Sequence, residues 1–486
     1  MKDMKKILYS LLAVASLFVV ESAMAQSRTS YHMEGSIFRN ELNPALAPTR
    51  GYLALPGMSG VGLSMGSNWL SVDNLIYERD GGLVTGLHSS VSADEFLGRI
   101  PDITNMYMRE SLNVLGLGFY TGKSFWTIGV EQRMSLDFNL SKDIFRAAKT
   151  LGNGVYDLSD TSLHGTAYLD AYLGTSIHFC KWLSIGVKAK FLVGVANINA
   201  SFSQLALNVS ESGAVGELKG DWYGNAVVVD NAKALGAVQP TINDFLNLDP
   251  MQMLDRADSY GFAFDVGTEI RLWKNHIKIS AALTDFGLIR WSPATYISGQ
   301  VTGGVGYNGF NFESGEIDAT GTINTDKLFM NDAKGYETRL NMGFNAGFEL
   351  NFLRNHIALG VMSHTELVGS EPITEITASL NLRPAHWLSA TVSRTFQNNN
   401  CPGVFGAALN FHPGVLNIFV SADFIDPNFV VGPQIEALGG RNLLLSRYAQ
   451  GINLYAGVGI NFARPKYMRE EARELKAQRK AKRRGL

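Results

Sequence analysis

The chain alternates between apolar residues and polar or small residues over long stretches. In residues 451–462 the apolar positions are Ile452, Leu454, Ala456, Val458, Ile460 and Phe462, and Asn, Tyr and Gly stand between them. A period of two is typical of a β-strand with one apolar face. Soluble sandwiches and membrane barrels both have this pattern, but the apolar face points inward in the first and outward in the second.

The alternating stretches come in pairs, and each pair is joined by a short turn. A longer segment rich in Gly, Asn and Asp then leads to the next pair. The six short turns lie at residues 120–124, 178–182, 272–276, 352–356, 383–386 and 412–415. A first strand within residues 51–65 and a closing strand at 451–462 bring the predicted number to about 14 strands.

The composition of the polar face separates the two architectures. In residues 339–352, bulky apolar residues alternate with Asn, Gly and Glu. A soluble sandwich would carry Lys, Glu and Thr on its solvent face, whereas small residues and charges of both signs fit a crowded lumen, and a bulky apolar face fits lipid. The sequence therefore predicts an all-β protein, a transmembrane antiparallel barrel of the outer membrane over residues 51–463. A large secreted β-protein is the alternative.

The first 25 residues have the features of a secretory signal peptide. Lys2, Lys5 and Lys6 precede an apolar stretch of 14 residues, and Ala23-Met24-Ala25 forms a small-x-small cleavage site. The apolar stretch is shorter than the ~20 residues of a spanning helix. We therefore expect residues 1–25 to be removed on export, and the mature protein to lie in the outer membrane of a Gram-negative cell among membrane lipids.

Charge is distributed unevenly along the chain. Residues 464–486 carry a net charge of +7, whereas residues 26–463 carry −10. This basic tail follows the last strand, so we expect it in the periplasm. It is either a solvated end or a segment that contacts an acidic periplasmic partner through its charge. We expect no nucleic acid among the partners.

Charged residues also occupy the polar face of the predicted strands. We interpret them as an ion-pair network in the lumen. Its predicted members are Glu131, Arg133, Lys188, Lys190, Asp265, Glu269, Arg271, Glu349 and Asp423. Paired carboxylates for acid–base catalysis are the alternative interpretation.

Motifs of catalysis are missing from the sequence. It has no G-x-S-x-G nucleophile elbow, no H-E-x-x-H and no C-x-x-C, so we predict no enzyme activity, no catalytic residue, no cofactor and no metal site. Five histidines do fall beside the predicted short turns: His178, His276, His356, His386 and His412. A ring of amphipathic side chains at the membrane interface explains this placement, and a zinc or pH-sensing ring is the alternative.

The segment before the first strand resembles a known family. Residues 33–48, "MEGSIFRNELNPALAP", are similar to the N-terminal hatch of FadL-like long-chain fatty-acid transporters, whose plug carries an Asn-Pro-Ala motif. Here the motif is Asn43, Pro44 and Ala45, and the resemblance implies a plug over residues 26–50. The whole chain also resembles an uncharacterised outer-membrane barrel family of Bacteroidetes and barrels associated with type IX secretion. The basic tail departs from the fatty-acid transporters.

Two functions follow as hypotheses. The first is a plugged barrel that passes or holds a hydrophobic small molecule. Aromatic residues of the long connections could form an apolar capture site for it, although ordinary loop packing also explains them: Trp69, Tyr107, Trp222, Tyr223, Phe310 and Phe312. The second is a structural barrel whose tail or loops dock a secretion or cell-surface assembly. A lipid hydrolase is disfavoured because no Ser/His constellation is present.

Overall fold

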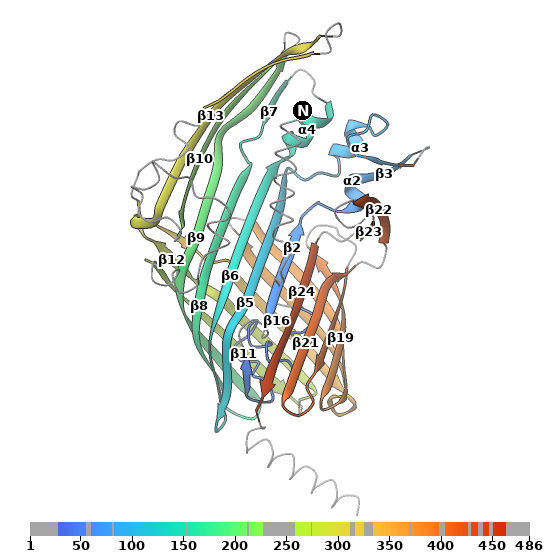
Figure 1. Cartoon of the computed structure of the whole chain (residues 1–486). Coiled ribbons are helices and arrows are strands. Elements are labelled where there is room, and N and C mark those ends of the chain that lie inside the picture. Colours follow the sequence, from blue (N-terminus) through green and yellow to red (C-terminus); the bar gives the residue numbers. More distant parts are fainter. Residues whose placement is uncertain are drawn as a thin grey trace, which may run out of the picture.

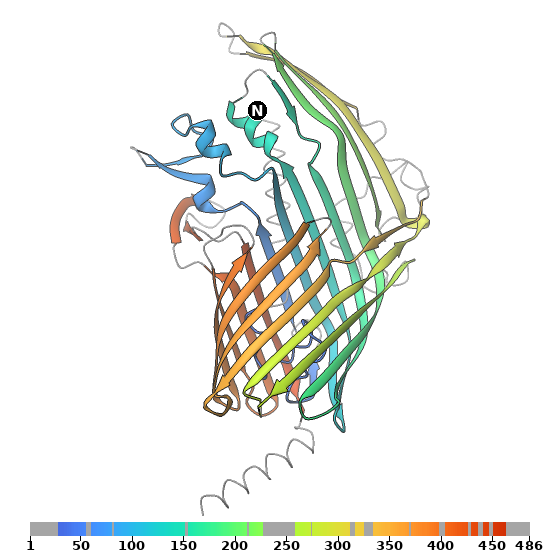
Figure 2. The ribbon, with the colours of Figure 1, turned by 180° about the vertical axis from the view of Figure 1, so that it is seen from behind.

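The structure is a computed structural model, and its fold is dominated by long antiparallel strands (Figures 1 and 2). It describes residues 28–54, 60–79, 82–150, 154–210, 213–226, 258–273, 275–311, 316–324, 334–368, 371–397, 404–425, 429–435, 441–446 and 451–462. The predicted signal peptide and the basic tail lie outside these residues.

Fourteen strand positions form a closed antiparallel barrel. Two short strands, β1 (Tyr52–Ala54) and β2 (Val61–Ser67), share the first position, and both pair with β5 on one side and β24 on the other, which closes the barrel. The other thirteen are β5 (Ile103–Thr121), β6 (Ser124–Ser141), β8 (Ser162–His178), β9 (Leu183–Ser210), β11 (Ser259–Leu272), β12 (Ile277–Trp291), β16 (Met342–Phe352), β17 (Ile357–Val368), β18 (Glu371–Ala385), β19 (Leu388–Gln397), β20 (Val404–Phe411), β21 (Leu416–Ile425) and β24 (Gly451–Asn461). The predicted fold class is confirmed.

The six short turns gather at the lower end of the barrel in Figure 1. Five of them lie where the alternation predicted. The turn predicted at residues 383–386 lies slightly later, because β18 continues to Ala385 and β19 begins at Leu388. The pairing register shifts between Leu382 and Ala385, so β18 contains an irregularity where it approaches its turn.

The two faces of the wall have opposite exposures. On β16, Phe344 and Phe348 are 49% and 39% exposed, whereas Asn345 and Glu349 are 0% and 1% exposed. The apolar face therefore points away from the lumen, as in barrels of the outer membrane. At the turn end, Phe179, Trp182 and Trp273 are exposed, in the position where aromatic residues border a membrane interface.

At the opposite end, one side of the wall rises far above the other (Figures 1 and 2). Strand β9 continues upward, and β10 (Gly213–Ala226), β13 (Tyr296–Asn311) and β14 (Glu316–Asn324) extend the sheet beside it. Strand β7 (Gly154–Asp157) pairs with the upper part of β9, and β15 (Tyr336–Arg339) pairs with β12. Much of what the sequence suggested as long loops is therefore sheet.

Short helices and hairpins complete this upper end. They are α2 (Val72–Leu75), β3 (Ile76–Arg79), β4 (Gly82–Thr85), α3 (Ala93–Leu97), α4 (Lys142–Thr150), η1 (Pro293–Thr295), β22 (Phe429–Ile435) and β23 (Arg441–Ser446), while η2 (Leu353–Asn355) lies in a short turn. Trp69, Tyr77, Phe96 and Phe145 pack into a small core of their own there. Among the described residues, no helix has the length and apolarity needed to cross a membrane.

Candidate functional site

Residues 28–50, called here the N-terminal segment, lie inside the lower half of the barrel (Figures 1 and 2). The segment consists of turns and bends, and most of its side chains are buried. It joins the wall at β1, directly after its last residue. A chain of this kind inside a barrel needs partners for its backbone and polar groups, and the inner face of the wall supplies them.

Glycines of the wall form the seat of the N-terminal segment. A Cβ on Gly186 would lie 2.1 Å from the backbone of Pro44, and a Cβ on Gly267 would lie 2.1 Å from Asn43 Oδ1. The same close approach recurs at Gly347 against Tyr31, Gly360 against His32, Gly406 against Thr29, Gly457 against Phe38 and Gly459 against Ile37. The glycines of the inner face are therefore required where the segment touches the wall.

The Asn-Pro-Ala motif contacts one side of this seat. Asn43 Nδ2 donates to the carbonyl oxygens of Thr268 and Ala281, each at 3.3 Å, and Asn43 Oδ1 accepts from the backbone N–H of Ala45 at 2.9 Å. Ser176 Oγ donates to the Ala45 carbonyl oxygen at 3.0 Å. The motif is thus fixed to β8, β11 and β12, and its role as a hatch stays a prediction.

An ion-pair cluster holds the first half of the segment. Glu349 Oε1 accepts from Arg383 at 2.7 Å, and Glu349 Oε2 lies 3.4 Å from Lys278 Nζ. Lys278 also pairs with Glu34 of the segment. Arg383 Nη2 donates to the His32 carbonyl oxygen at 2.7 Å, so that the wall binds both the charge and the backbone of the segment.

Higher in the lumen, Asp423 binds the start of the segment. Its Oδ2 accepts from the backbone N–H of Arg28 at 3.0 Å and from Asn453 Nδ2 at 2.9 Å. The Arg28 side chain reaches Glu375 at 3.0 Å. The predicted residue Asp423 is therefore a contact of the N-terminal segment.

A buried apolar cluster joins the N-terminal segment to the wall. Phe38 packs against the rings of Tyr455 and Phe419, with centroids 5.0 and 5.9 Å away. Met33, Ile37, Tyr52 and Phe125 belong to the same buried cluster. The Tyr455 hydroxyl donates to Glu41 Oε1 at 3.1 Å.

Five of the predicted lumen charges meet on the wall formed by β6, β9, β11 and β12. Arg133 pairs with Glu131 at 2.8 Å, and Lys190 pairs with Asp265 at 2.8 Å. Lys188 lies over the ring of Tyr172, 4.6 Å from its centroid. Two further carboxylates, Asp285 and Asp170, complete this cluster. Asp285 lies 3.1 Å from Arg133 and 2.6 Å from Lys190, and Asp170 on β8 lies 3.7 Å from Arg133.

The remaining predicted pair lies near the short turns. Arg271 Nε donates to Glu269 at 2.7 Å, and Arg271 Nη2 donates to Ser184 Oγ at 2.9 Å. The nine predicted residues are therefore distributed over four groups of contacts, of which two hold the N-terminal segment.

Sequence reasoning missed several charged residues of the lumen. Asp285 sits in a bulge with φ 58°, and the alternation of β12 changes parity there: Lys278, Ser280 and Thr284 face inward, but Phe286 is exposed. This change of parity was the signal that could have found it. Asp170 lies between Tyr168 and Tyr172 on the inner face of β8. Because these two neighbours are aromatic, the sequence shows no run of small or polar residues that would mark this face as lining the lumen.

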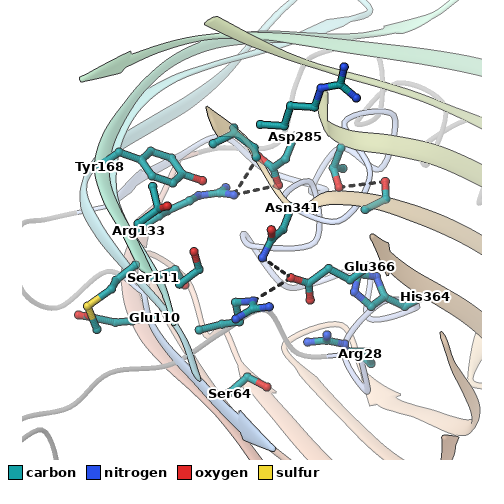
Figure 3. Close-up of a pocket in the computed structure, with 18 residues that line it drawn as sticks. Arg28, Ser64, Glu110, Ser111, Arg133, Tyr168, Asp285, Asn341, His364 and Glu366 are labelled. Atoms are coloured by element: carbon teal, nitrogen blue, oxygen red, sulfur yellow. Dashed lines mark hydrogen bonds and ion pairs between the residues drawn. The ribbon is translucent and has the colours of Figure 1, made fainter. Parts of the chain in front are cut away.

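A cavity of about 130 Å³ lies above the N-terminal segment (Figure 3). Six barrel strands and the segment supply its polar lining. The side chains that face it include Arg28, Ser64, Arg109, Ser111, Arg133, Tyr168, Asp285, Asn341, His364 and Glu366. Arg109 pairs with Asp137 and with Glu366, both at 2.8 Å.

Two of the histidines beside the turns contact backbone atoms, and His178 Nε2 lies 3.3 Å from the Arg271 side chain. His276 Nδ1 lies 3.1 Å from the Asn351 carbonyl oxygen, and His356 Nδ1 lies 2.8 Å from that of Arg383. Within the described part of the chain, no group of three or more His, Cys, Asp or Glu side chains is arranged to hold a metal ion.

Two residues of the predicted aromatic capture site lie in separate clusters of the described structure. Trp69 is buried in the small upper core, and Tyr223 packs edge-on against Tyr336 with centroids 4.9 Å apart. Phe312 lies outside the described residues. Trp69 fits ordinary packing, because its ring has no surface left for a ligand.

The fold is similar to solved outer-membrane channels at very low sequence identity. The toluene transporter TbuX of Ralstonia pickettii is 8% identical, with 89% of this chain and 100% of that chain covered and a TM-score of 0.41. A FadL homologue of Pseudomonas aeruginosa is 8% identical, with 91% and 100% covered and a TM-score of 0.42. The toluene transporter TodX of Pseudomonas putida is 8% identical, with 90% and 94% covered and a TM-score of 0.36.

Comparison with curated proteins finds no match to the chain. One family model matches residues 44–423, which include the Asn-Pro-Ala motif and most of the barrel. The chain therefore belongs to the family of unknown function DUF5723.

Proposed function

We propose that the protein is an outer-membrane barrel that admits a small molecule from outside to the cavity and releases it inward when the N-terminal segment moves. The observation that carries this proposal is the position of the segment, whose buried side chains pack against the inner face of the barrel and whose Arg28 lines the cavity. If the segment blocks the lumen, passage of a molecule requires the segment to move.

The segment has the properties of such a part. It contributes no strand to the barrel, and the ladders between the strands are complete without it. Its bonds to the wall come mainly from side chains, such as Arg383, Lys278 and Asp423. Displacement of the segment would therefore break local contacts and leave the barrel intact. A gate has this property, whereas a structural core does not.

Removal of residues 28–50 tests the gate. The wild-type protein in liposomes should be nearly impermeable to small solutes, and the deletion variant should let them pass. Deletion of residues 464–486 is the control and should leave the wild-type barrier unchanged. The gate is refuted if the barrel without the segment, shown by its heat-modifiable migration to be folded, remains as tight as the wild type.

A hydrophobic ligand, as the sequence predicted, is the second candidate. The described residues offer it an apolar hollow of about 240 Å³ on the outer face of the wall, with Met134, Leu136, Ala167, Ile198, Trp222 and Ile297 in its lining. Arg133 and Asp137 face the lumen, so Met134 and Leu136 on the same strand face outward. Trp222→Ala should weaken toluene binding if this hollow captures such molecules.

Anchoring of a secretion or surface assembly, including a type IX system, stays a prediction. It rests on the basic tail, which lies outside the described residues. Loss of residues 464–486 should abolish such docking but leave uptake through the lumen unchanged.

A further inference from the structure

The end of the barrel that carries the six short turns is positively charged. Between the last residue of one strand and the first of the next, these turns contain four cations and no Asp or Glu, although residues 26–463 carry a net charge of −10. The four cations are Lys123, Lys181, Lys274 and Arg354.

Exposed cations at the opposite end of the barrel have carboxylate partners within the chain. Arg146 lies 3.0 Å from Asp143, and Arg290 lies 2.7 Å from Glu337. Charges of both signs therefore occur together in the upper region and compensate each other there.

The cations of the short turns differ in this respect. Within the described part of the chain, Lys123, Lys181 and Arg354 are exposed, and their side chains form no ion pair with a carboxylate. An anion that approaches this end of the barrel therefore meets cations without a partner in the chain, and the turns contain no carboxylate that would repel it.

Bulky apolar side chains stand beside these cations. Phe179 and Trp182 lie on either side of Lys181 in the sequence, and Leu353 precedes Arg354. Phe179 is 76% exposed and Leu353 is 68% exposed. Leu353 and Arg354 both have a positive φ, 46° and 59°, which residues with a Cβ rarely adopt. The turn thus presents an apolar and a cationic side chain together in spite of a backbone cost.

A leaflet of anionic phospholipid matches both features. Aromatic rings and the apolar stems of Lys and Arg lie at the level of lipid head groups, and a guanidinium group binds a phosphate through paired hydrogen bonds. A soluble acidic polymer would neutralise the cations but leave the apolar side chains in water. A leaflet of zwitterionic lipid would take up the apolar side chains but offer the cations no net negative charge.

We propose that the short-turn end of the barrel selects anionic phospholipids, of the phosphatidylglycerol type, in the leaflet that it adjoins. Lys123, Lys181 and Arg354 bind the phosphate groups, and the apolar side chains beside them pack against the upper part of the acyl chains. This selection of lipid does not require the N-terminal segment to move, so it stands or falls apart from the gate.

The test uses the full-length protein in phosphatidylcholine vesicles at low salt, where surface charges are least screened. Electron paramagnetic resonance measures how strongly spin-labelled phosphatidylglycerol and spin-labelled phosphatidylcholine each associate with the protein. One cation near the surface favours an anionic lipid about fivefold, so the ratio of the two association constants, averaged over all lipids in contact, should be about 2–3. Lys123→Gln, Lys181→Gln and Arg354→Gln together should lower this ratio about twofold.

A matched variant removes the same charge from the upper region. Arg79→Gln, Arg146→Gln and Arg290→Gln together should leave the ratio as in the wild type, and heat-modifiable migration shows that each variant is folded. An equal fall in both variants would reflect net charge alone and overturns the proposal, as does a wild-type ratio of 1.

Deletion of residues 464–486, which carry a net charge of +7, separates the contribution of the tail. The preference for phosphatidylglycerol should decrease but persist in the deletion variant, and the three substitutions in the turns should then abolish it. A preference that disappears with the tail alone overturns the proposal, because the tail and not the turns would then select the lipid.

Discussion

Gly186 and Pro44 are in backbone contact, so close that a Cβ on Gly186 would lie 2.1 Å from the Pro44 carbonyl carbon and 2.2 Å from the Ala45 nitrogen. Backbone atoms cannot turn aside as the end of a long side chain can. We predict that Gly186→Ala displaces the N-terminal segment and raises solute flux in liposomes toward that of the variant without residues 28–50.

Gly343→Ala is the matched control for Gly186→Ala. Gly343 also faces the lumen, but a Cβ there would meet only side-chain atoms, the nearest being Thr284 Oγ1 at 2.7 Å. That hydroxyl can rotate, so the barrier to solutes should stay as in the wild type. Equal solute flux through the Gly186→Ala and Gly343→Ala variants would show that the contact between the N-terminal segment and its glycine seat does not determine whether the lumen is closed.

Lys278 stands between two carboxylates, Glu34 of the segment and Glu349 of the wall. Lys278→Met removes the cation that Glu34 and Glu349 share and leaves the buried Glu349 with Arg383 and His32. Removal of one partner from a buried ion pair costs about 3–5 kcal/mol, so the free energy of unfolding in urea should fall by that order. A second change, Glu34→Gln, should restore part of the loss.

The exposed pair Arg290–Glu337 serves as the comparison. Its side chains are 76% and 47% exposed, and such pairs contribute about 0–1 kcal/mol. Arg290→Gln should therefore leave the free energy of unfolding nearly unchanged. Similar losses at Lys278 and Arg290 would mean that the ion-pair cluster around Glu349 does not stabilise the protein through buried charge.

The lipid-facing position of Phe348 predicts sensitivity to charge. Phe348 lies on β16, with its side chain exposed on the outer face. An arginine in the middle of a lipid face costs about 2–4 kcal/mol, so Phe348→Arg should lower the yield of folded barrel in lipid bilayers. Leu87→Arg, at an exposed position of the upper region, should assemble normally. Unchanged assembly of both variants would contradict the placement of this face in lipid.

The strands and turns could be predicted because their signals are local. Alternation defines each strand over about ten residues, and the short turns interrupt it, so the number of barrel strands follows from one sequence. The bulge at Asp285 was missed because charges were predicted on the polar parity of each strand, and the bulge changes that parity within β12. In the structure the strand continues through it, and φ 58° turns the carboxylate toward Arg133 and Lys190.

The pairing of the lumen charges could not be predicted from the pattern. Asp423 binds Arg28, 395 positions earlier in the chain, and Glu349 binds Arg383, 34 positions later. These contacts depend on the path of the N-terminal segment, which has no periodic signal. Several glycines of the inner face did carry information, since they mark places where another segment approaches the wall, but they do not say which segment.

The orientation of the barrel is testable with thiols on both sides. Cys180 is a free cysteine in the turn between β8 and β9, at the end that we assign to the periplasm. In a Cys401→Ser background, a membrane-impermeant maleimide should label Cys180 only after the outer membrane is permeabilised. A protein that also carries Cys180→Ser and Ser89→Cys should be labelled in intact cells, because Ser89 is exposed in the upper region. The reverse pattern would invert the orientation, and the cavity would then open toward the periplasm and could not receive a ligand from outside.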